Sequence, residues 1–437
     1  MCLIAWVPFN FRYKPDNMRL FWTFLVVLLT LPAGAQTQLT ATPDVSPAAS
    51  VMQQIGLTRI KVDYHRPAVN GRIIWGELVP FGQVWRAGAN ENTVIEVSTP
   101  VQINGKPLDA GKYGLHFLVE EKSVTVIFSR NSTSWGSFSY DPAEDALRVN
   151  AAFIPADKPR ERLEYNFEDL TPEAVNCAVT WGDKAISFQI TVDVGKTVVE
   201  SLADQLRTKP GWTWQGWHEA AGYCLVNNTH LEQGLQWATR SVFMAPNAQN
   251  ILRKAQLSSK SKGLTGQAAV GAELTSIRED LSRGNVTWKE YAAAANYAMK
   301  QESMDQAADW ADVAIAQGGG MNPSMVKVAI LKKEGKTKEA ESLKAKAISM
   351  GSNQELNAYG YQLLMAGNTV GAVEIFEANV AKNGDDPNVW DSLAEGYLSN
   401  GEKDKAVSAL KKCLGMNPPA NLKTHAEGLL QQAESNE

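Results

Sequence analysis

The sequence predicts an α+β protein in two blocks, with an N-terminal all-β sandwich or barrel and a C-terminal all-α array of helical repeats. Two observations predict this fold class. Between residues 50 and 195, apolar residues alternate with polar ones in short runs separated by turn signals, as in half-buried strands. From Gly195 onward the apolar period becomes helical, and one pattern returns after 34 residues. A chain of 437 residues is long enough for two or three domains.

The first block shows the strand pattern most clearly around Ile60, Val62 and Tyr64, which alternate with charged residues up to Pro67. Asn104-Gly105 is a hairpin signal, because both residues tolerate a positive φ angle. Further strands are expected at 93–103, 113–119, 124–128, 146–154, 162–167, 174–181 and 185–194, the last two joined by a turn at Gly182-Asp183. Short strands with turns between them favour an antiparallel sandwich or barrel.

The second block is clearest between residues 387 and 420. Its regularly spaced residues are Trp390, Leu393, Ala394, Tyr397, Gly401, Ala406, Leu410 and Pro418. This spacing resembles the tetratricopeptide repeat, a pair of helices of which each buries its apolar face only by stacking on neighbours. Gly367 and Ala372 lie 34 residues before Gly401 and Ala406, so the pattern recurs. We expect a tetratricopeptide-like array over 212–437, with a poorly marked helical hairpin at 249–285.

The N-terminus resembles a secretory signal peptide. Arg19 precedes an apolar run from Leu20 to Leu31, and Ala33-Gly34-Ala35 then matches a cleavage site. The run is too short to span a membrane, and Met18 is an alternative start. We therefore expect cleavage after Ala35, a periplasmic or secreted location, and no transmembrane segment in the mature chain.

The remaining boundaries follow from changes in composition. A polar, Pro- and Ser-bearing linker is expected over 36–49, the all-β domain over 50–195, and a connector over 196–211. Cys177, Cys224 and Cys413 each fall on an apolar face, so we interpret them as core residues rather than as disulfide partners.

Charge and motifs exclude several functional classes. Without residues 1–35 the chain has 39 basic and 46 acidic residues, a net charge of −7, and no basic cluster, which argues against nucleic-acid binding. No G-x-S-x-G or Walker motif is present, and His218-Glu219 lacks the second histidine of a zinc protease because position 222 is Gly222. We predict no catalytic residue, no cofactor and no metal site.

Three stretches of the first block carry a family resemblance. They are HRPAVNGRIIWGELVPFGQVWRAGANENT (65–93), NGKPLDAGKYGLHF (104–117) and WGSFSYDPAEDALRV (135–149). Over roughly residues 45–195 the chain resembles the bacterial family catalogued as domain of unknown function 2911. The combination with a signal peptide and helical repeats is similar to members from Bacteroidetes-type bacteria. The resemblance implies an exported β-rich domain and supplies no catalytic residues.

Candidate ligand-binding residues lie in polar loops of the β block. In one loop Arg86 is suited to clamp a carboxylate or phosphate, because its planar fork donates two parallel hydrogen bonds. The other candidates are Arg66, Arg72, Trp85, Asn90, Glu91 and His116. The alternative is a folding role in which Arg86 and Asn90 bind loop carbonyls and Trp85 fills the core. A metal site built from His65 and His116 has no supporting ligand spacing.

The tryptophans that follow Pro210 allow two interpretations. Trp212, Trp214 and Trp217 suit a stacking platform for sugar rings or a peptide. The favoured interpretation is packing, with Trp212 at the seam between the two blocks.

Together these features predict a non-enzymatic binding or scaffold protein of the cell envelope. The groove of the helical array would receive a protein or peptide partner. The first alternative is binding of a carbohydrate or small ligand by the β domain, and the second is an uncharacterised hydrolase.

Overall fold

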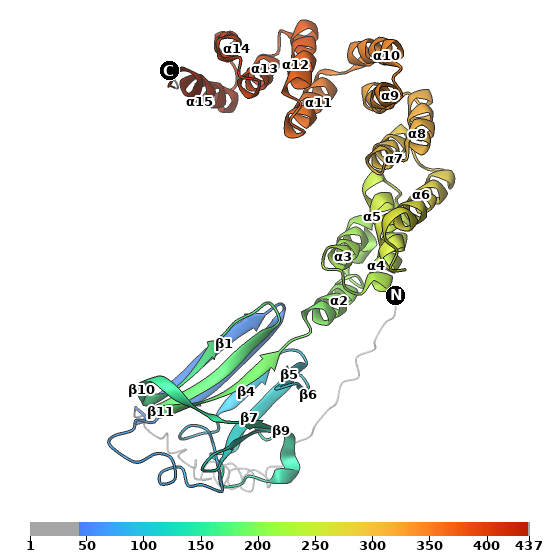
Figure 1. The fold of residues 1–437 in the computed structure, drawn as a ribbon. Helices are drawn as coiled ribbons and strands as arrows, with labels where there is room; N and C mark the ends of the chain where they lie inside the picture. Colours follow the sequence, from blue (N-terminus) through green and yellow to red (C-terminus); the bar gives the residue numbers. More distant parts are fainter. Residues whose placement is uncertain (1–42, 436–437) are drawn as a thin grey trace, which may run out of the picture.

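The computed structural model describes residues 43–435, so the predicted signal peptide and the first half of the predicted linker, residues 36–42, lie outside the described part. Figure 1 shows a β block at one end of an elongated molecule and a curved array of helices leading away from it. The predicted fold class is confirmed: strands lie between Ala48 and Thr191, and helices follow from Val194.

Two antiparallel sheets form the β block. The strands are β1 (Ala48–Ile55), β2 (Thr58–His65), β3 (Gln83–Trp85), β4 (Val94–Val97), β5 (Val101–Ile103), β6 (Lys106–Leu108), β7 (Gly111–Val119), β8 (Val124–Ser129), β9 (Asp145–Ala151), β10 (Phe153–Glu168) and β11 (Ala174–Thr191). One sheet has the order β1-β2-β4-β7-β8-β9 with β3 paired to β7, and the other has the order β10-β11-β5-β6. Trp85 ends β3, and His116 lies on its partner strand β7. Arg66 and Arg72 instead follow β2.

The core lies between these sheets, which makes the block a sandwich. Ile60, Val62 and Tyr64 are buried, as their alternation predicts. Phe128 of one sheet packs edge-on against Phe188 of the other, with ring centroids 5.7 Å apart. The apolar faces of both sheets therefore share one cluster.

Strand β11 corrects a sequence prediction. Residues 174–194 were expected to form two strands with a turn at Gly182-Asp183, yet β11 runs without a break from Ala174 to Thr191. Gly182 has φ 62° and pairs with Arg160, where the register of β10 shifts. A glycine at positive φ can mark a bulge as well as a turn, and here the long partner strand β10 favours the bulge.

The helices form antiparallel pairs. They are α2 (Val194–Gln205), α3 (Trp214–Val226), α4 (Leu231–Met244), α5 (Ala248–Lys260), α6 (Gly266–Ser282), α7 (Trp288–Lys300), α8 (Met304–Ala316), α9 (Met321–Lys333), α10 (Thr337–Met350), α11 (Asn353–Met365), α12 (Thr369–Asn383), α13 (Pro387–Ser399), α14 (Lys403–Gly415) and α15 (Ala420–Ser435). Helices α5 and α6 confirm the hairpin expected at 249–285. The odd-numbered helices from α7 to α13 lie on the inner side of the arc and the even-numbered ones on its outer side (Figure 1).

The segment expected as a connector contains helix α2 and a 3-10 turn at Lys209–Trp212. Val199 and Leu206 pack in the cluster that contains the cores of α3 and α4. Trp212 does not pack at a seam, because it is 81% exposed. Its neighbour Trp217 is held instead, since its Nε1 donates to the Gly211 carbonyl over 2.8 Å.

The small residues of the repeats and the three cysteines are buried, as predicted. Ala340, Ala372 and Ala406 are fully buried where helices meet, and Cys177, Cys224 and Cys413 are buried free thiols. None of the described helices is both long enough and apolar enough to cross a membrane.

Candidate binding surfaces

Buried side chains make hydrogen bonds that fix the loop after β3. Ala87 has φ 52° and is fully buried, and its carbonyl accepts hydrogen bonds from Tyr165 Oη over 2.9 Å and Thr93 Oγ1 over 3.1 Å. Trp85 donates through Nε1 to the Gly88 carbonyl over 3.2 Å. Its ring stacks on Trp181, with centroids 5.8 Å apart. Trp85 is thus partly buried and packs against the core.

Glu91 lines a shallow pocket of about 520 Å³ beside β1 and β2, and Asn90 precedes it in the chain. The Asn90 side chain donates to the Ser46 carbonyl over 3.3 Å. Glu91 Oε2 lies 3.3 Å from His65 Nε2. Both candidate side chains are therefore engaged with neighbouring protein groups.

Arg86 is the exception among the loop residues. Its guanidinium carbon lies 6.0 Å from the Trp135 ring and 5.8 Å from the Phe138 ring, and these rings stack with centroids 5.6 Å apart. Both rings are exposed, by 63% for Trp135 and 80% for Phe138. Arg86 Nε is buried without a hydrogen-bond partner, and burial lowers the pKa of the guanidinium. The result is an exposed aromatic pair beside a cation.

His116 is buried against the segment between β8 and β9. Its Nδ1 lies 2.8 Å from Ser137 Oγ, and its ring centroid lies 5.3 Å from that of Tyr140. Burial lowers the pKa of His116 from 6.5 to about 4, which Asp145 only partly opposes. The imidazole is therefore neutral near pH 7.

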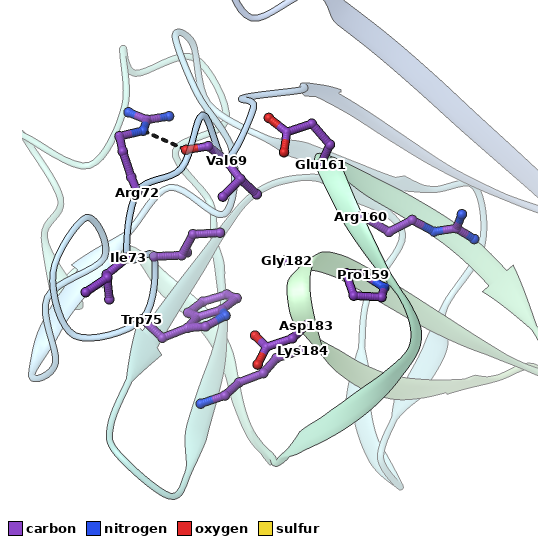
Figure 2. Close-up of a pocket in the computed structure, with 11 residues that line it drawn as sticks. Val69, Arg72, Ile73, Trp75, Pro159, Arg160, Glu161, Gly182, Asp183 and Lys184 are labelled. Carbon is purple, nitrogen blue, oxygen red and sulfur yellow. Dashed lines mark hydrogen bonds between the residues drawn. The ribbon is translucent and has the colours of Figure 1, made fainter.

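Arg66 and Arg72 lie away from this cluster and bind main-chain carbonyls. Arg66 Nε donates to Leu163 over 3.0 Å, and Arg72 Nε donates to Val69 over 3.0 Å. Arg72 lines a pocket of about 460 Å³. Figure 2 shows Arg72 at the rim of this pocket, and Trp75 between the loop that carries both residues and the strand that carries Arg160. The seven candidates are thus spread over several places, and their role as ligand-binding residues stays a prediction.

The inner face of the helical array contains a pocket of about 570 Å³ that sequence reasoning did not identify. Helices α7, α9 and α11 each contribute one wall, since odd-numbered helices face inward. Its apolar lining includes Trp288, Met299, Met325, Tyr359 and Leu363. We call this pocket the inner groove.

Polar amides stand among these apolar residues. Asn296, Asn322 and Gln362 also line the inner groove. Asn322 and Gln362 are exposed, and their side chains make no hydrogen bond within residues 43–435. The Asn296 Nδ2 donates to the Ala292 carbonyl over 3.1 Å, which leaves its oxygen available as an acceptor. The repeat spacing predicts the inner face, but not which side chains line it.

The fold defines a protein in two parts, a β-sandwich followed by a tetratricopeptide-type array. Residues 46–190 match the model of the family described as protein of unknown function (DUF2911), which confirms the resemblance of that part. No curated protein sequence matches the chain.

Solved structures similar to the chain include the following three. A tetratricopeptide repeat protein from Parabacteroides merdae is 14% identical over 55% of this chain and 93% of its own, with a TM-score of 0.28. The tetratricopeptide protein YrrB, described as having an unusual peptide-binding site, is 18% identical over 44% and 97%, with a TM-score of 0.22. The Cut9–Hcn1 hetero-tetramer of the APC/C is 14% identical over 55% of this chain and 46% of that chain, with a TM-score of 0.26.

Proposed function

We propose that the protein is an exported, non-enzymatic scaffold whose helical array binds an extended segment of a partner protein. One observation carries this proposal. The inner groove, about 570 Å³ in volume, combines an apolar lining with amide side chains that have unused hydrogen-bonding capacity. An extended peptide presents both apolar side chains and unpaired backbone groups, so it complements such a surface.

The composition of the groove favours a peptide over a rigid small molecule. Tyr359 and Trp288 offer large contact areas that lose little conformational entropy on binding. Asn322 and Gln362 each present both a donor and an acceptor, which suits a peptide backbone. The groove crosses three successive repeats, so a bound segment would lie across the helices and not within one pair.

Export rests on the sequence alone. A basic residue at Arg19, the apolar run and Ala33-Gly34-Ala35 support cleavage after Ala35 and a periplasmic or secreted location. N-terminal sequencing of the protein recovered outside the cytoplasm tests this part. Gln36 as the first residue supports it, and an intact N-terminus contradicts it.

The peptide hypothesis is tested by selecting binders from a displayed peptide library on the purified mature chain. Selected peptides are then titrated by fluorescence anisotropy against native protein, Tyr359→Ala and the control Val370→Ala, at a residue that does not line the groove. We expect Tyr359→Ala to weaken binding by about tenfold or more, as for a central aromatic contact. Val370 is 70% exposed on α12, and its variant should bind like the native protein. Equal binding by all three proteins would contradict the proposal.

A second candidate function is small-ligand or carbohydrate binding by the β domain. Trp135 and Phe138 form an exposed stack beside Arg86, and aromatic faces with an adjacent cation suit sugars that bear an acidic group. A glycan array probed with native protein and Trp135→Ala tests it. Signals that disappear in the variant support this function, whereas no signal above background contradicts it.

A further inference from the structure

A histidine and two carboxylates converge on the inner face near the C-terminus. Asp391 and Glu395 lie four residues apart on α13, and His425 reaches them from α15. His425 Nδ1 lies 3.0 Å from Asp391 Oδ2, and His425 Nε2 lies 3.6 Å from Glu395 Oε1. One ligand atom from each residue falls within 4.8 Å of the others, an arrangement that no other group of these residue types among the described residues shares.

Asp391 supplies the second observation. The residue is only 3% exposed, and its Oδ1 is a buried oxygen without any hydrogen-bond partner. A buried carboxylate oxygen that lacks a partner is costly, because it has lost water without gaining another donor. Asp391 also lines a pocket of about 560 Å³ between α11, α13 and α15, so a ligand can reach it from solvent.

We propose that Asp391, Glu395 and His425 bind a divalent transition-metal ion of the Zn²⁺ class. The donor set is one imidazole nitrogen and two carboxylate oxygens, and such mixed ligands suit zinc and its neighbours better than calcium or magnesium. The site does not depend on the peptide hypothesis, because it lies beyond α11 on residues that the inner groove does not use.

Binding an ion requires the three ligand atoms to adjust from their present separations. Zinc bonds of about 2.0–2.2 Å place tetrahedral ligand atoms about 3.4 Å apart. One ligand atom of each residue lies within 4.8 Å of the others, while the 3.0 and 3.6 Å separations involve the two different nitrogens of His425, of which one would ligate the ion. His425 is half exposed, so its ring is free to turn and offer one deprotonated nitrogen to the ion.

The site would hold the ion through three protein ligands and leave further coordination positions toward the pocket. Zinc with three protein ligands and an open position binds water or a ligand atom from another molecule. The ion would also tie α13 to α15, the last helix of the array. Metal binding should therefore stabilise the C-terminal repeat.

Isothermal titration of Zn²⁺ into the untagged mature chain, stripped with chelator, tests the proposal. We expect one site per chain, and binding at least about tenfold weaker in His425→Asn and in Glu395→Gln. The matched control is His230→Asn, because His230 contacts Thr229 and has φ 46°, a conformation that asparagine accepts. This control should bind Zn²⁺ like the native chain.

Thermal melts in chelator separate loss of ligation from loss of folding. In chelator His425→Asn should melt somewhat below the native chain, because the buried Asp391 carboxylate loses its His425 contact, and Zn²⁺ should raise the Tm of the native chain only. Three results would overturn the proposal: no Zn²⁺ uptake, uptake unchanged in His425→Asn, or Ca²⁺ bound more tightly than Zn²⁺.

Discussion

Glycines at equivalent repeat positions end the first helix of three successive pairs. Gly335, Gly367 and Gly401 have φ angles of 76°, 75° and 79°, and no atom lies within 4 Å of the place where a Cβ would stand. Their role is therefore conformational and not steric. A residue with a Cβ in this left-handed region costs about 1–2 kcal/mol.

Gly401→Ala should lower the free energy of unfolding of the helical array by about 1 kcal/mol. Gly415→Ala is the matched control, because Gly415 is the last residue of α14, has no neighbour within 4 Å and does not have a positive φ. Urea denaturation followed by circular dichroism measures both. Equal stability of the two variants would contradict a conformational role for Gly401.

His116 makes stability depend on pH. Its pKa is about 4 in the folded protein and 6.5 when unfolded, so below pH 6.5 the unfolded chain binds a proton that the folded chain does not. The free energy of unfolding should therefore fall by about 3 kcal/mol as the pH drops from about 6.5 to 4. Below pH 4 this group should cause no further loss. Urea denaturation across this range should show a shallower fall for His116→Gln. Parallel pH profiles would exclude His116 as the cause.

Single-residue roles were only partly predictable from the sequence. The alternation of apolar residues correctly predicts that Val62 is buried, and the repeat spacing correctly predicts that Ala406 is buried. The proposed metal ligands could not be found, because His425 approaches Asp391 from a helix 34 residues further along, without a local spacing motif. Trp212 was wrongly expected to be packed, since hydrophobicity alone does not fix which face of a short turn is covered.

At the scale of elements, one aromatic ring sets how closely three neighbouring helices pack. Phe376 of α12 is fully buried and meets Gly360 of α11 and Gly396 of α13. A Cβ on Gly396 would stand 2.8 Å from the Phe376 ring, and a Cβ on Gly360 would also overlap it. These glycines sit inside helices, where alanine would otherwise be favoured by about 1 kcal/mol.

Gly396→Ala should therefore destabilise the array by about 1–3 kcal/mol despite its better helix propensity. Combining it with Phe376→Leu should cost less than the sum of the two single changes, because the smaller side chain relieves the overlap. A double-mutant cycle in urea measures the coupling. Strict additivity would show that the ring and the glycine do not constrain each other.

Helices α5 and α6 are joined by a buried ion pair that the sequence pattern does not reveal. Lys254 Nζ lies 2.7 Å from Asp280 Oδ1 and 2.8 Å from Oδ2, and the Asp280 side chain is fully buried. The weak apolar marking of this hairpin has a physical reason, since part of its interface is ionic.

Lys254→Met alone should cost about 3–5 kcal/mol, because it leaves the Asp280 carboxylate buried with only the exposed Arg283 as a partner. The double variant Lys254→Met, Asp280→Leu should recover much of that loss. Chemical denaturation compares the two. A double variant as unstable as Lys254→Met would contradict the assignment of the cost to an uncompensated charge.

At the scale of the whole molecule, the β block and the helical array have separate cores. The cluster between the sheets ends at Val194, and Val199 and Leu206 of α2 already belong to the first helical cluster. Calorimetry of the full chain should therefore show at least two transitions. Lys254→Met should lower the temperature of a helical transition and leave that of the β block unchanged. A single transition that shifts as a unit would contradict separate cores.

The overall architecture was the most predictable feature, because alternation and a 34-residue period are repeated signals. The continuous β11 and helix α2 were not foreseen, since a glycine in a strand and a weakly patterned segment each allow two structures. The sequence predicts that the array has a groove, but not which residues line the inner groove, because its lining depends on how three repeats stack.

Site-specific photo-crosslinking in cells that make the protein tests the central claim most directly. A photoreactive residue replaces Asn322 in the inner groove or Val370, which is exposed on α12 and does not line the groove. Binding of a partner segment in the groove predicts a discrete adduct from position 322 and none from position 370. Adducts of equal yield from both positions, or from neither, would contradict the groove as the binding surface.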